Sequence, residues 1–560
     1  MPEPRRQNLH PQSHVVACRG NRSGRARART HGYVHASTLI FVLLTAIVVV
    51  AVIAKRFALP YPIAFVVGGS LLAFIPNLPP LHLDPEYIFL IFLPPLLYSG
   101  GWLTDWKTFR ENARPIGLLA IGLVVATTGA VAIVAHALLP NFPWTSAFVL
   151  GAIVSPPDAV AASAVFERFS VPRRIAAIID GEGLVNDATA LVIYRFAIIA
   201  ALTGTFSLAN ASVAFVAVSL GGIAIGLAIA ATLVELTVKL RKHDISDPLI
   251  ENALQLIAPY AVYLAAETVH GSGVLATVAA GIYVSRQSHR IYDPEGRLVA
   301  ANVWELLIFL LNGLVFLLIG LQLREIVHDP TFAARGLGVG LAISALVIVV
   351  RVAWVFPATY VPRWIFRGIA AREGTPDAKF IFVIGWSGMR GIVSLAGALA
   401  IPTLTNAGAR FPGRDEIILI TFCVIFVTLV FQGLSLIPIL RWFKIEGDDN
   451  LDEREIEVRV LALRAGITRM RELEPHFGST AEWEVEGRLL GEYEYRIAHL
   501  SGHLDGTAAP DSVAFDHRIQ AEALEAERRE ITRLREVGEI PDEIYRRVQY
   551  DLDLATERLT

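Results

Sequence analysis

The chain has 560 residues, of which 54% are hydrophobic and only 18% are charged. A mean hydropathy of +0.51 excludes an ordinary soluble globular protein and predicts a polytopic membrane protein. Two cysteines, Cys18 and Cys423, exclude a disulfide framework and a cysteine metal cluster. The net charge of −3 is unevenly spread: from Phe443 onward 28 Asp and Glu face 16 Lys and Arg, whereas the rest holds 24 acids and 33 bases.

Residues 1–35 form a basic leader with seven arginines and one acid, Glu3, and we expect it to be disordered. The apolar segment 36–54 is long enough to span a bilayer and lacks a clean cleavage site, so it predicts a retained helix rather than a signal peptide. The arginines conflict with the orientation derived below. One hypothesis is that translation starts later, for example at Val34, so that residues 1–33 are absent from the mature chain.

The domain 36–443 carries about thirteen apolar segments of spanning length, with frequent Gly and Pro, as transmembrane helices tolerate. Basic clusters follow spans five, seven and eleven, which predicts an outside N-terminus and a cytoplasmic C-terminal tail. The fold class expected is an all-α polytopic membrane protein with a soluble helical tail. The predicted spans are 36–54, 61–75, 86–102, 114–138, 144–165, 174–202, 211–238, 249–269, 271–285, 298–323, 336–358, 380–401 and 415–438.

Residues 444–560 are acidic and have helical periodicity with dense mixed charge. This pattern predicts a solvated helical domain that serves regulation or dimer contacts. No catalytic motif is visible in it.

The first candidate site element is 155–160, Ser-Pro-Pro-Asp-Ala-Val, in the fifth span. Adjacent prolines remove two backbone donors, so the helix should break beside Asp158 and free carbonyl groups. Broken helices at membrane depth bind small ions in transporters, which makes Ser155 and Pro157 possible ligands through side chain or backbone. The alternative is a proline kink in which Asp158 is a structural hydrogen-bond acceptor.

The second element is 181–187, Gly-Glu-Gly-Leu-Val-Asn-Asp, in the sixth span. A charge at the centre of a membrane helix costs about 2.5–3.5 kcal/mol on insertion scales, so Asp187 predicts an ion or proton site. Oxygen ligands suit a hard monovalent cation, and desolvation favours the protonated acid, so one carboxylate can hold either Na⁺ (or K⁺) or H⁺. Glu182 and Asn186 share a helix face. The alternative, a buried acid paired with a base, fits Glu182, with Arg351 as the first choice of partner.

The third element is 385–391, Gly-Trp-Ser-Gly-Met-Arg-Gly, in the twelfth span. Three glycines weaken the helix, and Arg390 places a permanent charge beside the break, where it would balance Asp158 or exposed carbonyls. Spans five and twelve are seven apart, as expected for equivalent helices in two inverted repeats, so two broken helices should cross. No lysine lies deep in any predicted span.

These three elements resemble the signature segments of the monovalent cation:proton antiporter family, the sodium/proton exchangers, over roughly residues 36–443. The resemblance implies a thirteen-helix fold, usually a homodimer, with a mobile core domain that moves against a dimerisation domain by alternating access. It also implies that Asp187 binds the ion or proton and that Asn186 orients the site. The Asn-Asp pair resembles the electroneutral members.

The resemblance further implies that Asp158 holds the unwound crossing, that Glu182 pairs with Arg351, and that Arg390 sits at the second crossing. Ala159 and Gly183 depart from the family pattern, which often has proline and serine there. With Pro157 standing where many members have threonine, the chain lacks two hydroxyls that help to bind the ion. Water or backbone carbonyls would substitute for them, which makes Gly183 a possible ligand through its backbone.

The leading prediction is therefore an electroneutral Na⁺/H⁺ antiporter of the plasma membrane that serves pH and sodium homeostasis and needs no cofactor. Its expected partners are membrane lipid, the transported ions and a second copy of the chain, and no nucleic acid is expected. A K⁺/H⁺ antiporter on the same fold is the nearest alternative. A cation channel would need a continuous pore or filter loop, and an intramembrane enzyme would need a nucleophile with a paired base; neither pattern is visible.

Overall fold

The computed structural model describes residues 41–557, and the basic leader 1–35 lies outside the described residues. The chain divides into two compact units, Met1–Gly447 and Asp448–Thr560, whose described parts are taken in turn below. Within it, nothing is described for residues 76–84, 167–168, 170, 205–206, 244, 246, 293, 324–329, 367, 369–370, 372–373, 407, 446–449, 474–479, 505–509, 538 and 540.

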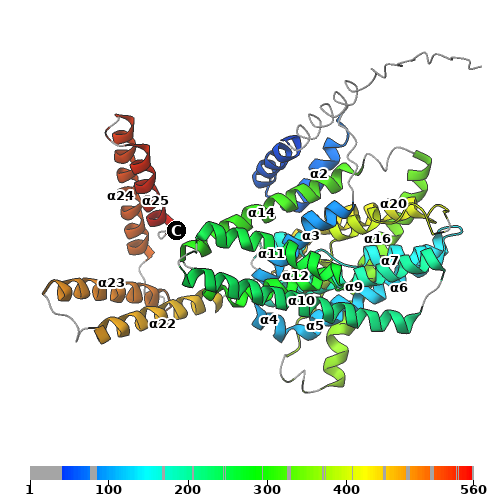
Figure 1. The fold of residues 1–560 in the computed structure, drawn as a ribbon, viewed down its shortest axis with the longest axis horizontal. Coiled ribbons are helices and arrows are strands. Elements are labelled where there is room, and N and C mark those ends of the chain that lie inside the picture. Colours follow the sequence, from blue (N-terminus) through cyan, green and yellow to red (C-terminus); the bar gives the residue numbers. More distant parts are fainter. Residues whose placement is uncertain are drawn as a thin grey trace, which may run out of the picture. The chain divides into compact units, whose positions relative to one another are not determined.

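The first unit is a bundle of helices, and each of the thirteen predicted spans contains helix (Figure 1). Residues 41–56 form the first. Eight helical stretches of the described residues are long and apolar enough to cross a membrane. The labelled helices begin with α2 (Tyr61–Leu72), α3 (Pro85–Leu103), α4 (Trp106–Glu111), α5 (Ala113–Gly117), α6 (Val124–Leu138), α7 (Trp144–Val154), α8 (Ala159–Phe166), α9 (Arg173–Thr203) and α10 (Leu208–Lys242).

The remaining helices of this unit follow in chain order. The predicted block 249–285 resolves into two helices, as its two segments require. These helices are α11 (Pro248–Thr268), α12 (Gly273–Arg286), α13 (Ser288–Ile291), α14 (Pro294–Leu321), α16 (Pro330–Ile365), α18 (Ala378–Trp386), α19 (Ile392–Leu399), α20 (Arg414–Phe426) and α21 (Gly433–Phe443).

Irregular helix occurs in four spans. The fifth breaks between α7 and α8, and the twelfth breaks between α18 and α19, at the two places that the sequence predicts. The fourth and thirteenth contain π-helical segments, η1 (Leu118–Leu123) and η2 (Val427–Gln432), which the sequence does not predict. Pro94 and Pro95, by contrast, leave α3 unbroken.

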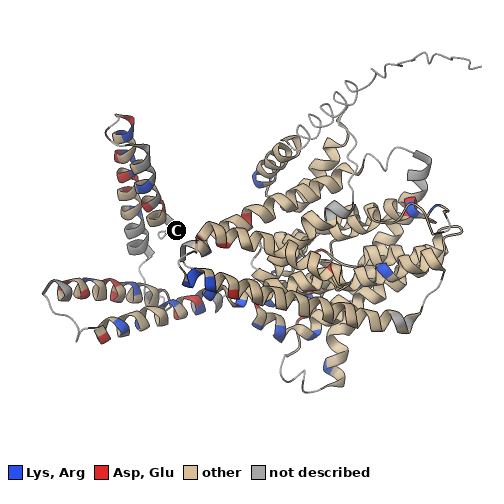
Figure 2. Ribbon diagram, viewed as in Figure 1, with Lys and Arg blue, Asp and Glu red and all other residues tan. Residues whose placement is uncertain are grey.

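The second unit contains α22 (Asn450–Leu473), α23 (Thr480–Leu504), α24 (Pro510–Glu536) and α25 (Asp542–Glu557). Helix α22 packs against α23, and α24 packs against α25. Charged residues line these four helices densely, whereas they are sparse along the membrane helices (Figure 2). This unit is helical, as the charge pattern predicts.

Candidate functional site

The two broken spans meet at a backbone hydrogen bond. The amide of Asp158, in the gap between α7 and α8, donates to the carbonyl of Met389 in the gap between α18 and α19, at 2.6 Å. The Asp158 carboxylate accepts the amide of Val160 at 2.9 Å and so caps the first turn of α8. Because both partners come from interrupted helices, the crossing satisfies backbone groups that neither helix can satisfy alone.

Carbonyl groups that the helix break leaves free are bound by side chains from other helices. Arg390 donates from Nε to the Val154 carbonyl at 3.1 Å, and Asn186 donates from Nδ2 to the Pro157 carbonyl at 2.7 Å. Ser155 is fully buried, and its hydroxyl donates back to Ala152 at 3.0 Å. Both Ser155 and Pro157 therefore contribute to the geometry of the break.

Arg390 is fully buried and binds carbonyls at both breaks. Besides Val154, its guanidinium donates to the Gly388 carbonyl, and its amide donates to the Thr428 hydroxyl at 3.0 Å. Of the two roles predicted for this cation, balancing Asp158 or balancing exposed carbonyls, the contacts correspond to the second. A permanent charge here offsets the partial negative charges of carbonyl oxygens at two interrupted helix ends.

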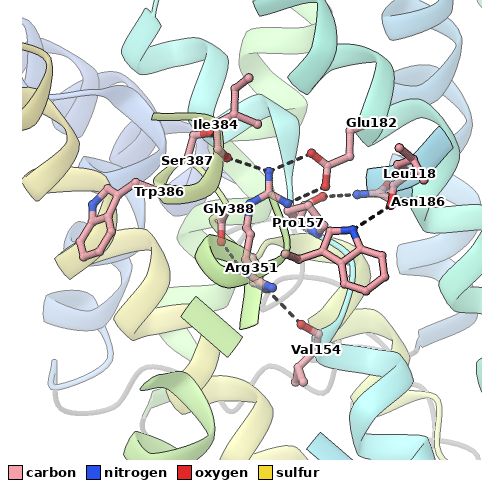
Figure 3. Close-up of polar contacts among 12 residues, drawn as sticks. Leu118, Val154, Pro157, Glu182, Asn186, Arg351, Ile384, Trp386, Ser387 and Gly388 are labelled. Carbon is pink, nitrogen blue, oxygen red and sulfur yellow. Dashed lines mark hydrogen bonds and ion pairs between the residues drawn. The ribbon is translucent and has the colours of Figure 1, made fainter. Parts of the chain in front are cut away.

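The predicted ion pair between Glu182 and Arg351 is present and completely buried (Figure 3). The guanidinium donates to the carboxylate through its two Nη atoms, with Nη1–Oε1 at 2.5 Å and Nη2–Oε2 at 2.8 Å. Nη2 also donates to the Ile384 carbonyl at 3.2 Å. Gly388 makes room for it, because a Cβ there would overlap the Arg351 side chain. Glu182 thus commits both oxygens to Arg351.

Asn186 and Asp187 present oxygens that no group of the described residues binds. Asn186 is fully buried, and its Oδ1 has no hydrogen-bond partner in the described part of the chain. Asp187 is half-buried, and among the described residues no side-chain hydrogen bond or ion pair reaches its carboxylate. Asp158 is close enough to repel it electrostatically. Two carboxylates and a free amide oxygen at membrane depth can bind a hard cation or a proton, either of which removes that repulsion.

Two glycines set the shape of this region. Gly183, a possible ligand by sequence, lies against α8, where a Cβ would be 2.5 Å from Cβ of Ala159. Gly391 lies against the Asp158 carboxylate, and a Cβ there would overlap it. Two of the three positions at which the chain departs from the family pattern, 159 and 183, thus lie against each other.

The second crossing is supported by helix η2, which the sequence analysis missed. Thr428 accepts the Arg390 amide, and Gln432 donates to the Trp386 carbonyl. Ser435 of α21 accepts the indole N–H of Trp386 at 3.0 Å. A glutamine inside the apolar run 415–438 is the one signal that could have indicated this, since buried amides need partners.

Comparison with known proteins gives consistent matches. A family model described as "Sodium/hydrogen exchanger, transmembrane" matches residues 41–442. An uncharacterized Na⁺/H⁺ exchanger of Mycobacterium tuberculosis is 32% identical over 547 residues, covering 96% of this chain and 98% of that protein. A sodium, potassium, lithium and rubidium/H⁺ antiporter of Bacillus subtilis is 32% identical over 514 residues, covering 90% and 75%.

The fold also matches a solved structure. The sodium proton antiporter MjNhaP1 from Methanocaldococcus jannaschii superposes with a TM-score of 0.53 at 20% identity, covering 71% of this chain and 99% of that one. At this identity the likeness concerns the fold. With the family match over the whole membrane part, it shows that the chain belongs to the sodium/hydrogen exchanger family and is a multi-pass membrane antiporter, not an enzyme.

Proposed function

We propose that this chain exchanges Na⁺ for H⁺ by alternating access and that the exchange is electroneutral. The observation that carries the proposal is the Asp187 carboxylate, which no side chain of the described residues binds and which lies within electrostatic reach of Asp158. The preceding residue, Asn186, is buried, and its Oδ1 has no partner among the described residues. The other charges nearby have protein partners, because Glu182 binds Arg351, Arg390 binds carbonyls, and the Asp158 carboxylate accepts the Val160 amide. Asp187 is therefore the group left to exchange one cation for another.

In this mechanism Asp187 holds Na⁺ in one half of the cycle and H⁺ in the other. Both states relieve the repulsion from Asp158 and the cost of an isolated charge at membrane depth, so each favours the movement of the helices. An unoccupied carboxylate does not, which couples the two fluxes. Because each half of the cycle carries one positive charge on the same group, no net charge crosses per turnover. Asn186 holds the Pro157 carbonyl and keeps the break in α7–α8 beside Asp187.

K⁺ is the second candidate cation. The Bacillus subtilis relative is named for sodium, potassium, lithium and rubidium. This chain also has no hydroxyl at positions 157 and 183. A site with fewer fixed ligands discriminates less by size, which supports transport of K⁺ beside Na⁺.

We further propose a homodimer in the plasma membrane, with the tail from Lys444 in the cytoplasm. Support for this orientation comes from the loop charges. Lys239, Arg241 and Lys242 end helix α10, and Arg173 begins α9. Six and eight of the thirteen predicted spans separate these two clusters from the tail, and an even number returns the chain to the same side of the membrane. Cross-linking of intact cells tests the dimer, and protease digestion of the tail in inverted vesicles tests the orientation.

The decisive experiment is exchange by the purified full chain in proteoliposomes. Gradients of Na⁺, Li⁺ or K⁺ are imposed, and internal pH is followed with a trapped dye, with and without a valinomycin voltage clamp. We expect Na⁺-driven proton flux that the clamp leaves unchanged. Asp187→Asn should abolish it, while Asp415→Asn, whose side chain is 74% exposed, should not.

Four results would each contradict a part of the proposal. Cation movement without proton flux would exclude antiport. Retained exchange in Asp187→Asn would show that the Asp187 carboxylate is not the group that binds the ion and the proton. A rate that rises when the voltage is clamped would exclude electroneutrality. Proton flux driven by K⁺ but not by Na⁺ would show that the exchanged cation is K⁺ and not Na⁺.

A further inference from the structure

One group of membrane helices is joined by glycines that bring backbones into contact. Gly69 of α2 and Gly320 of α14 face each other, as do Gly101 of α3 and Gly281 of α12, and Gly226 of α10 lies on the backbone of α12. We name α2, α3, α10, α11, α12 and α14 the α12 group. Such contacts interlock main chains at short range and resist sliding.

A second group is joined in the same way around the ion site. Gly151 of α7 lies on the backbone of α6, Gly183 of α9 on α8, and Gly385 of α18 on α16. Asp158 and Arg351 fill the spaces that Gly391 and Gly388 leave. We name α6, α7, α8, α9, α16, α18 and α19 the α9 group.

The surface between the two groups is different in kind. Helix α9 meets α3 and α12 through aliphatic side chains that form one cluster: Leu93, Leu97, Leu184, Ala188, Val274 and Val278. No described glycine of either group lies against the backbone of the other group. Aliphatic side chains of this type can exchange neighbours without losing directed bonds, so this surface is where one group can move past the other.

A polar tie crosses this surface eight residues after Asp187. Arg195 of α9 binds both carboxylate oxygens of Glu267 at the end of α11, at 2.7 and 3.0 Å. Glu267 also accepts the amide of Gly273, the first residue of α12, at 3.2 Å. The pair therefore attaches α9 to the turn that joins two helices of the α12 group.

We propose that the Arg195–Glu267 ion pair is a latch. It holds the α9 group and the α12 group in the arrangement of this structure, and it opens once in each transport cycle. This inference rests on the alternating-access function proposed above. When the α9 group moves against the α12 group, the contact between Arg195 of α9 and Glu267 of α11 has to break. The latch thus sets the balance between the two facing states without touching the transported ion.

The exposure of the pair suits this role. The side chains are 48% and 29% exposed, so the protein does not enclose either charge as they separate. A half-exposed pair shifts an equilibrium by roughly two- to fivefold, whereas a fully buried pair such as Glu182–Arg351 would hold one state almost permanently. A latch that opens in every cycle therefore has to be a half-exposed pair.

The test uses a reporter cysteine between the ion site and the latch. In full-length protein carrying Cys18→Ser and Cys423→Ala, Leu191→Cys places a thiol in the same cluster of α9, and Tyr194→Cys provides a second reporter. A membrane-impermeant maleimide is added separately to intact cells and to inverted vesicles, and the labelling rate is measured. Arg195→Gln and Glu267→Gln are the latch variants.

We expect each latch variant to raise labelling from the Thr203 end of α9 by about two- to fivefold, with partial recovery in Arg195→Lys. The matched control is Arg290→Gln. Its partner Glu235 lies at 2.9 Å with exposures of 40% and 53%, but both residues lie on the side of the α12 group, so labelling should not change.

Labelling that stays equal to the parent in both latch variants, at both reporters, would overturn the latch. Because this assay needs no cation, it separates the two proposals. A parent protein without Na⁺-driven exchange contradicts the proposed function, whereas an active parent with unchanged labelling contradicts only the latch. In active protein, the same variants should also shift the apparent affinity for the external cation by two- to fivefold.

Discussion

The carboxylate of Asp158 lies against Gly391, so that a side chain of the first broken span fills the space that a glycine of the second leaves. The neighbouring Asp158–Met389 hydrogen bond fixes this register at 2.6 Å. The acid and the glycine belong to motifs more than two hundred residues apart in the sequence. Their contact explains why the third element, 385–391, ends in a glycine.

Gly391→Ala should therefore disable exchange. The added methyl group overlaps the Asp158 carboxylate, and overpacking of this kind costs about 1–3 kcal/mol, so either the crossing opens or Asp158 leaves its place. We expect the exchange rate to fall by about tenfold or more in proteoliposomes. The control is Gly397→Ala in α19, where a Cβ meets Ile153 at an ordinary 3.4 Å. Equal rates in the two variants would show that the contact is unimportant.

Glu182→Gln should destabilise the membrane unit strongly. It leaves the buried Arg351 guanidinium without a counter-charge, and breaking one side of a buried pair costs about 3–5 kcal/mol. Thermal unfolding in detergent measures the loss. Glu235→Gln, which breaks an exposed pair, should cost less than about 1 kcal/mol. A double variant, Glu182→Met with Arg351→Met, should regain much of the stability, because no uncompensated charge remains.

Asn186→Asp should damage the first break. It removes the amide that donates to the Pro157 carbonyl and places a third carboxylate beside Asp158 and Asp187. Loss of the buried donor alone costs about 1–3 kcal/mol. We expect a lower melting temperature in detergent and slower exchange at neutral pH, with part of the loss recovered as the pH falls and the added acid is protonated. Unchanged melting would contradict the role assigned to this hydrogen bond.

Gly183→Ser should impair exchange by displacing α8, although serine is common at this position in the family. A Cβ at 183 would be 2.5 Å from the Ala159 methyl group, closer than van der Waals contact allows. We expect about a tenfold loss of exchange rate, from a strain of roughly 1–3 kcal/mol. Adding Ala159→Gly should restore most of the rate, since it removes the opposing methyl group. A double variant no better than the single one would exclude this clash.

The thirteen spans and the helical tail could be predicted from sequence because each depends on local composition. Apolar length identifies a membrane helix, and dense mixed charge identifies a solvated one. The breaks at 155–160 and 385–391 were predictable for the same reason, since Pro and Gly weaken a helix through their own backbones. Their positions in the structure agree with that prediction.

Proline alone did not decide where a helix breaks. Pro94 and Pro95 lie inside a continuous α3, while Pro156 and Pro157 end α7. The difference lies in the partners: Arg390, Asn186 and Met389, all distant in sequence, bind the backbone groups freed at the second pair. The π-helical segment η2 likewise depends on its fit to the second crossing through Thr428 and Gln432.

Sequence by itself determined the fold class, the membrane segments and the acids that membrane burial makes costly, because those follow from the chemistry of single residues and short segments. Tertiary structure alone decided which charges neutralise one another. The sequence offered Arg351 as the first choice of partner for Glu182, and the structure commits Glu182 to it and Arg390 to carbonyls. Among the described residues, no side chain binds the Asp187 carboxylate. Electrostatic and hydrogen-bond energies depend on distance and burial in three dimensions, and neither quantity is a property of the linear chain.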